Sequence, residues 1–146
     1  MRLIEPGTKT EFEGYYALRW RVLRSPWGGA PGSERDPTDD DSLHLMLIDD
    51  GDQPLAVGRL HFNSTEEAHI RFLAVEEHCR GRGLGRRLMA ALEERASAQG
   101  ARRVVLDARE NAVSFYLRLG YVDEGPVGVR FGNIPHRRMI KTLPDT

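Results

Sequence analysis

The chain is short of cysteine: its 146 residues contain one, Cys79. A lone cysteine excludes an internal disulfide framework and a structural zinc site built on several thiolates, and it fits a reducing compartment. The sequence also lacks any apolar run near the roughly 20 residues that a membrane-spanning helix needs. Glu5 and Gly7 follow closely on Met1, which is not the pattern of a signal peptide. We therefore expect a soluble, cytoplasmic protein with no membrane partner.

An excess of charge of one sign is also missing. Lys plus Arg number 21 and Asp plus Glu number 22, which gives a formal net charge of −1. A domain whose main partner is nucleic acid normally carries a clear basic excess, so we expect no nucleic-acid partner. The apolar fraction of 40% is that of a folded chain. Its length suits a single domain, 1–146. No spacing of His, Asp or Glu indicates a metal site.

The order of the periodic segments predicts the fold class. The order is a meander, a crossover helix, a strand, a second helix and a closing hairpin. This order indicates an α/β (α+β) domain with a mixed, mostly antiparallel sheet flanked by helices. We expect strands at 2–5, 42–49, 55–62, 68–75, 102–108, 121–127 and 134–142. We expect helices at 11–24, from Leu84 to a stop at Gly100, and at 111–119.

A long loop at 25–41 is rich in proline and glycine, and a loop of this length in a compact domain is often functional. It ends in an acidic run: Glu34, Asp36, Asp39, Asp40 and Asp41. The simpler interpretation is that these acids are solvated charges on the surface of a loop. The more specific interpretation is that they attract a cationic amine substrate. In the helix before the loop, Arg19 interrupts the apolar stripe.

The glycine-rich segment from Arg80 to Gly85 is the most informative part of the sequence. It joins an expected strand to the start of an expected helix, where free N–H groups and the helix dipole attract anions. Glycines let the backbone approach a phosphate, and four arginines add charge: Arg80, Arg82, Arg86 and Arg87. The patterns of the nucleotide P-loop and of the dinucleotide-binding loop both fail to match. Taken alone, the segment could also be a flexible, solvated turn.

Two motifs carry a family resemblance. Arg80-x-x-Gly83-x-Gly85 resembles the [Q/R]-x-x-G-x-[G/A] signature of the GNAT superfamily of acyl-CoA N-acyltransferases. The segment from Asn111 to Tyr121 resembles the second motif of that family, an asparagine, then a tyrosine, then a Leu-Gly-aromatic ending. The element order agrees over nearly the whole chain, and residues 18–24 and 134–139 resemble those of small bacterial members.

The resemblance implies acetyl-CoA as the cosubstrate. Backbone N–H groups of residues 81–86 would hold its pyrophosphate, and the backbone of Leu73 and Val75 would pair with its pantetheine arm. Backbone donors near that strand would stabilise the oxyanion of the tetrahedral intermediate that forms when the amine attacks the thioester. The residues expected to contact the cosubstrate are Leu73, Val75, Arg80, Gly81, Arg82, Gly83, Leu84, Gly85, Arg86, Asn111 and Tyr116. Asn111 could instead, or in addition, cap its helix.

Tyr116 is the expected general acid, because a phenol beside the CoA sulfur can protonate it as it leaves. From periodicity alone, Tyr116 could be a core residue of its helix. The attacking amine must lose a proton, and His69 is the expected base, since some family members carry a carboxylate base at that strand position. Alternatively, His69 has no catalytic role, and the base is His136, His44 or His61. A chain of water molecules could also remove the proton without a dedicated base.

The leading interpretation is therefore transfer of an acetyl group from acetyl-CoA to a primary amine by direct attack on the thioester. A non-catalytic acyl-CoA-binding or sensing module is the alternative, and a nucleic-acid-binding domain using the arginine cluster is a third. The acceptor, a small molecule or a peptide amine, stays open. Exposed edges of a mixed sheet would permit a homodimer.

Overall fold

In the part of the chain that the structure describes, seven strands form one mixed sheet in the order β1-β2-β3-β4-β5-β7-β6. The computed structural model describes residues 1–130 and 134–144. The strands are β1 Arg2–Ile4, β2 Leu43–Ile48, β3 Pro54–Phe62, β4 Glu67–Val75, β5 Arg103–Arg109, β6 Val122–Arg130 and β7 Ile134–Thr142. The helices are α1 Lys9–Leu23, α2 Leu84–Ala98 and α3 Val113–Arg118, with short 3-10 turns at Ser25–Trp27, Pro37–Asp41, Glu77–Cys79 and Glu110–Ala112.

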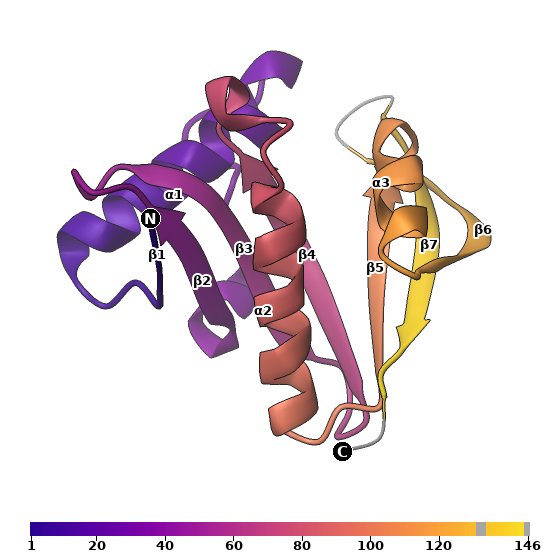
Figure 1. Cartoon of the computed structure of the whole chain (residues 1–146). Coiled ribbons are helices and arrows are strands. Elements are labelled where there is room, and N and C mark those ends of the chain that lie inside the picture. The colour runs from indigo at the N-terminus through magenta and orange to yellow at the C-terminus, as the bar shows by residue number, and fades with distance from the viewer. Residues whose placement is uncertain (131–133, 145–146) are drawn as a thin grey trace.

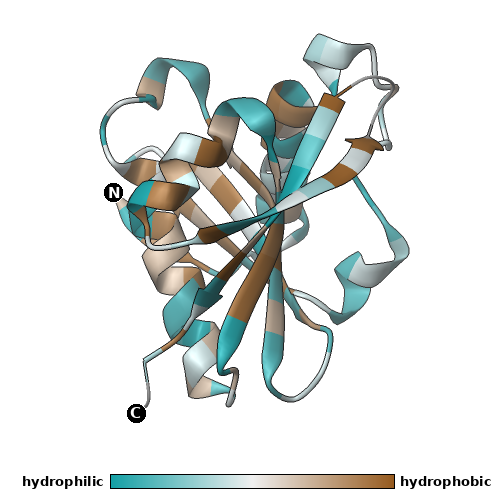
Figure 2. Cartoon of the chain, turned by 90° about the vertical axis from the view of Figure 1, so that its right-hand side faces the viewer, coloured by the Kyte–Doolittle hydropathy of each residue, from teal (hydrophilic) through white to brown (hydrophobic). Residues whose placement is uncertain are grey.

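The sheet buries both of its faces. Leu45 and Leu47 of β2 pack with α2, whereas Met46 and Ile48 of the same strand pack with α1. Because alternate residues of a strand point to opposite faces, α1 and α2 cover opposite faces. Figure 2 shows the apolar segments along the strands in the middle of the molecule and hydrophilic ones in the surrounding loops. The predicted mixed, mostly antiparallel sheet flanked by helices is confirmed.

The ends of two helices differ from the sequence-based expectation. Helix α1 begins at Lys9 rather than residue 11, because Thr8 and Glu11 form a capping box that satisfies the first N–H groups. Helix α3 is limited to Val113–Arg118, because a 3-10 turn occupies the residues before it. In the described part of the chain, no helix combines the length and the apolar character needed to cross a bilayer.

Strands β4 and β5 are the parallel pair, and they stay together only briefly. Their register covers Glu67↔Arg103, Ala68↔Val104 and His69↔Val105, and beyond these positions they diverge. Figure 1 shows them close together near the C-terminus and far apart at their other ends, with α2 beside one and α3 beside the other. Past His69, the edge of β4 that faces β5 is therefore left without a strand partner.

A bulge in β4 lies at this opening. The register with β3 shifts between Val57 and Arg59, and Phe72 has a φ of 58°. Ile70 packs on the α2 side of the sheet, whereas Ala74 packs on the α1 side, so the bulge reverses the alternation. A left-handed backbone is uncommon for a residue other than glycine, and the surroundings of Phe72 must stabilise it.

Buried ion pairs lie on the α1 side of this bulge. Arg19 is fully buried and donates to Asp39 at 3.0 Å, and Arg59, also fully buried, reaches Asp39 at 3.0 Å and Asp36 at 2.6 Å. Arg71 of β4 reaches the other oxygen of Asp36 at 3.1 Å. The acidic loop is thereby tied to α1, β3 and β4.

This network corrects two expectations. Glu34 and Asp39 are buried, and Asp36 is largely so, so these carboxylates are neither solvated charge nor an attractor for a cationic amine. Only the exposed Asp40 and Asp41 fit the interpretation as solvated charge. Arg19 does not interrupt the buried face of α1 but belongs to it, because a buried carboxylate pairs with its guanidinium.

Four guanidinium groups also surround the ring of Phe72. Their central carbons lie 4.2 Å (Arg19), 4.7 Å (Arg71), 4.9 Å (Arg59) and 5.3 Å (Arg24) from the ring centroid. Cations over an aromatic face are attracted by its quadrupole, and the attraction grows when both are shielded from water. The arginine cluster therefore holds Phe72, and with it the bulge, in place.

Replacing Asp39 with Asn should destabilise the fold strongly. The change leaves the buried guanidiniums of Arg19 and Arg59 short of a charge partner, and breaking a buried ion pair costs roughly 3–5 kcal/mol. Urea unfolding measures the loss. Asp41→Asn, in the same 3-10 turn but exposed, is the matched control and should change the free energy of unfolding by less than about 0.5 kcal/mol. Equal, small losses in both variants would contradict the role given to Asp39.

Candidate active site

A cavity of about 740 Å³ fills the opening between β4 and β5. Its walls come from the end of α1, residues 70–75 of β4, the glycine-rich loop, residues 106–109 of β5, and α3. The lining includes residues from both faces of the sheet, such as Leu84 of α2 and Leu23 of α1. The cavity therefore passes between the separated strands from the α2 side to the α1 side.

The glycine-rich loop forms the α2 end of this cavity. Gly81 and Gly83 have φ values of 80° and 79°, and a side chain added at either position would meet nothing within 4 Å. The first backbone bond of α2 runs from the Arg87 N–H to the Gly83 carbonyl at 3.0 Å. The N–H groups of residues 84–86 thus have no acceptor within the helix and point out of its end. Open space, glycine backbone and unpaired donors together suit a phosphate.

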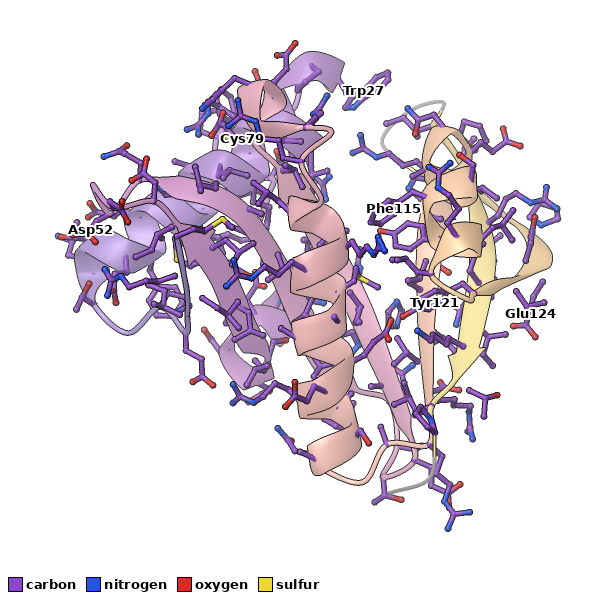
Figure 3. The ribbon with its side chains drawn as sticks, in the orientation of Figure 1. Trp27, Asp52, Cys79, Phe115, Tyr121 and Glu124 are labelled. Atoms are coloured by element: carbon purple, nitrogen blue, oxygen red, sulfur yellow. The ribbon has the colours of Figure 1, made fainter. Side chains whose placement is uncertain are left out.

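Gly85 serves packing rather than conformational freedom. A Cβ at this position would lie 3.2 Å from Cζ of Phe115 and 3.6 Å from Cγ2 of Val75. Figure 3 shows Phe115 pointing from α3 toward α2 across the opening. The absence of a side chain at Gly85 therefore lets α3 approach the start of α2 and narrow the cavity.

Tyr116 of α3 lines the cavity, as do Leu73 and Val75 of β4. Its ring packs against those of Phe115 and Tyr121, with centroids 5.0 and 5.8 Å away. Burial raises the pKa of the Tyr116 phenol, and the nearby Arg109 offsets only part of this rise. Tyr116 is therefore protonated at neutral pH and has a proton to donate.

Asn111 also lines the cavity, but it is not a helix cap. It lies inside the 3-10 turn Glu110–Ala112, and the N-cap position of α3 is Ala112, with no side-chain hydrogen bond to the helix. The capping alternative for Asn111 is wrong, because the turn shifts the start of α3 two residues along the chain.

The structure places His69 at the last position where β4 still pairs with β5. Its ring stacks on His61 at a centroid distance of 4.8 Å. Burial, with a smaller contribution from His61, lowers the pKa of His69 to about 4. Neither histidine is among the residues that line the cavity. His44 is occupied by hydrogen bonds to the Tyr15 hydroxyl and the Asp39 carbonyl, both at 2.8 Å.

His136 of β7 does line the cavity. It is buried, and its Nδ1 lies 2.9 Å from the carbonyl oxygen of Ile134, which can only accept. Nδ1 therefore carries the proton, and in the neutral ring Nε2 keeps the lone pair. His136 is the cross-strand partner of Arg109, so both lie on the same face of the sheet.

Three arginines at the α1 end of the cavity are functional candidates that the sequence did not reveal. Arg24 caps the C-terminus of α1, Arg71 lies on β4 and Arg109 ends β5. Each is isolated in the sequence, and only the divergence of the two strands brings them to one place. Within the described residues, no three His, Cys, Asp or Glu side chains gather to hold a metal ion.

Comparisons with known proteins identify the family and the fold of the chain. The model of the acetyltransferase (GNAT) family matches residues 12–121. The uncharacterised N-acetyltransferase YjcF of Bacillus subtilis (strain 168) is 32% identical over 141 residues, which cover 97% of this chain and 99% of YjcF.

Solved structures with the same fold include an acyl-CoA N-acyltransferase from Pseudomonas aeruginosa, with a TM-score of 0.81 and 28% identity over 97% of both chains. An aminoglycoside 6'-N-acetyltransferase complexed with coenzyme A has a TM-score of 0.80 over 100% of this chain and 99% of its own. At 18% identity, this second likeness concerns the fold alone.

Gly83→Val should abolish binding of CoA at the loop. The new side chain would occupy the open space above the N–H groups of residues 84–86, where the pyrophosphate is expected. Thermal unfolding with and without CoA measures this, since a ligand at 100 times its Kd stabilises a protein by about 2.7 kcal/mol.

The control for this variant is Gly32→Val, because Gly32 has a comparable φ of 100° and also has nothing within 4 Å of an added Cβ. Both variants are strained, but only Gly32→Val should keep the rise in Tm with CoA. If CoA stabilises Gly83→Val as well as it stabilises the wild type, the assignment of the loop is wrong.

Proposed function

The chain belongs to the acetyltransferase (GNAT) family and is a GNAT-type N-acetyltransferase, and from this premise we propose how its own residues carry out the transfer. One observation supports the proposal above all. The glycine-rich loop, the unpaired edge of β4 and Tyr116 line a single cavity that passes through the sheet. A non-catalytic acyl-CoA-binding module would have no need of a protonated phenol in that place.

Acetyl-CoA enters from the α2 side in this proposal. The N–H groups of residues 81–86 hold the pyrophosphate, helped by Arg80, Arg82 and Arg86. The pantetheine arm lies between the separated strands and takes up backbone groups of Leu73 and Val75 that β5 leaves unpaired, with Asn111 on the opposite wall. The thioester then lies near the bulge at Phe72.

The reaction is a direct transfer. The nitrogen of a neutral primary amine attacks the thioester carbonyl and forms a tetrahedral intermediate, whose oxyanion is stabilised by backbone N–H donors at the bulge. The C–S bond then breaks, the acetyl group stays on nitrogen, and the departing sulfur takes a proton from the Tyr116 hydroxyl. The nitrogen, positively charged after its attack, loses one proton, which passes through solvent to the Tyr116 phenolate and restores the hydroxyl. The products are an N-acetyl amine and CoA.

The attacking amine also has to lose a proton, since a lysine-like amine has a pKa of about 10.4. His136 is the better placed of the two histidine candidates, because it lines the α1 end of the cavity and keeps the lone pair on Nε2. His69 lies on the same face but outside the lining, and its pKa of about 4 makes it a weak base. We therefore propose His136 as the first candidate and His69 as the second.

Tyr116→Phe should lower kcat by roughly 100-fold or more and leave the KM for acetyl-CoA nearly unchanged. The change removes the proton donor and keeps the ring that packs against Phe115 and Tyr121. Release of CoA with a panel of primary amines measures turnover.

The matched control is Tyr121→Phe, because Tyr121 belongs to the same ring cluster but donates to Glu93 at 2.8 Å. It should lose about 1 kcal/mol of stability and keep its kcat. A normal kcat in Tyr116→Phe would mean that the sulfur receives its proton elsewhere.

Substitution, rather than the pH profile alone, separates the two bases, because the acceptor amine titrates in the same direction as an imidazole. A His69 base would add its own loss of kcat only as the pH falls toward about 4. We expect His136→Gln to lower kcat at pH 7 by roughly 100-fold and His69→Gln to have little effect. The reverse result would assign the base to His69, and two active variants would leave deprotonation to water.

A further inference from the structure

We propose that the acceptor amine also carries an oxyanion, a carboxylate or a phosphate, which binds Arg24, Arg71 and Arg109 at the α1 end of the cavity. The inference rests on the proposed N-acetyl transfer and names the chemical class of its acceptor. It differs from the more specific of the two sequence-based interpretations of the acidic run, in which these acids attract a cationic amine.

The three arginines converge on one place from three elements. Arg24 directly follows α1, and the Arg109 guanidinium donates to the carbonyl of Leu23, the last residue of α1, at 2.7 Å. Arg71 lies on the α1 face of β4, since it reaches Asp36 in the loop on that side. All three line the cavity, and all three are shielded at least partly from water.

Among the residues that the structure describes, arginines outnumber carboxylates at this end of the cavity. Asp36 and Asp39 together face three arginines, Arg19, Arg59 and Arg71. The nearby acids have cationic partners of their own: Glu34 has Arg35 at 3.4 Å and Asp107 has Arg138 at 2.8 Å.

Arg24 and Arg109 bring two further guanidinium groups to this end of the cavity. Burial, together with Arg109, Arg71 and Arg19, lowers the pKa of the Arg24 guanidinium to about 10. A bound anion would relieve this repulsion among the guanidiniums.

The phosphates of acetyl-CoA do not account for these arginines. The loop that suits the pyrophosphate lies at the N-terminus of α2, on the opposite face of the sheet, and has arginines of its own. The thioester would lie by the bulge at Phe72, whose ring contacts both Arg24 and Arg71. An amine that reaches the thioester carbonyl from the α1 side therefore brings the rest of its molecule among Arg24, Arg71 and Arg109.

Guanidinium groups narrow the chemistry of the acceptor. Their planar forks match carboxylate and phosphate oxygens in bidentate pairs, whereas they repel a second ammonium group. The cavity would thus accept a molecule with an amine at one end and an oxyanion at the other, and it would reject a polyamine.

Matched pairs of acceptors test the proposal. An amino acid is paired with its amide, O-phosphoethanolamine is paired with ethanolamine, and spermidine is the polycation. Because the anionic group also changes the pKa of the amine, each kcat/KM is calculated for the neutral form of the amine. With acetyl-CoA saturating, CoA release should give a kcat/KM at least roughly tenfold higher for an anionic member than for its neutral partner. The pair with the larger ratio of kcat/KM between its anionic and neutral members shows whether the site prefers a carboxylate or a phosphate.

Arg24→Gln should lower the ratio of kcat/KM between the preferred anionic acceptor and its neutral partner by roughly tenfold or more. Because Arg24 also contacts Phe72, a disturbed bulge would instead lower both kcat/KM values alike and leave their ratio unchanged. Arg24→Lys keeps the charge and should recover part of the loss. Arg21→Gln is the control, since Arg21 lies one turn before Arg24 but pairs with Glu76 outside the cavity lining.

Binding of the oxyanion can be measured without turnover. Inorganic phosphate and acetate, added to the CoA-bound protein, should raise Tm in the wild type and less so in Arg24→Gln. Equal rates for anionic and neutral acceptors, or the absence of any Arg24-dependent rise in Tm, would overturn the proposal. If amines are acetylated without a preference for anionic acceptors, only the proposed acceptor class is refuted. If no amine is acetylated but anions still raise Tm in an Arg24-dependent way, only the proposed transfer is refuted.

Discussion

The early separation of β4 from β5 is the constraint on which the rest of the molecule depends. Two parallel strands that paired along their whole length would form an ordinary closed sheet with no passage through it. Here pairing ends at His69, and the following backbone of β4 faces a cavity instead of a neighbour. Unpaired backbone groups are costly when buried, so this edge is suited to an extended ligand that supplies the missing partners. The same opening joins the two faces of the sheet, which allows donor and acceptor to enter from opposite sides.

The buried arginine network keeps that opening in shape. Arg19 and Arg59 are fully buried, and such charges are tolerable only because Asp36 and Asp39 pair with them. Their guanidiniums also hold the ring of Phe72, whose left-handed backbone forms the bulge of β4. The loop at 25–41 thus serves the site indirectly, because its acids neutralise the arginines that hold the bulge.

Much of this could be predicted from the sequence, because the signals are local. Periodicity and glycine punctuation place the strands and helices to within a few residues, and the glycine-rich loop and Tyr116 belong to short motifs. The ion pairs could not be predicted, since Asp36 lies 23 residues from Arg59 and 35 from Arg71 along the chain. The bulge could not be predicted either. A glycine in the strand would have indicated a left-handed backbone, but here Phe72 adopts this conformation. His136 enters the site only because β7 inserts between β5 and β6.

The central claim is that one cavity through the sheet holds the donor on the α2 side and the acceptor on the α1 side, with Tyr116 at the junction. A crystal structure with CoA bound tests it most directly. The account predicts the pyrophosphate on the N–H groups of residues 84–86, the pantetheine arm along Leu73 and Val75, and the sulfur within hydrogen-bond distance of the Tyr116 hydroxyl. A CoA molecule bound outside the opening between β4 and β5, or a sulfur remote from Tyr116, would contradict it.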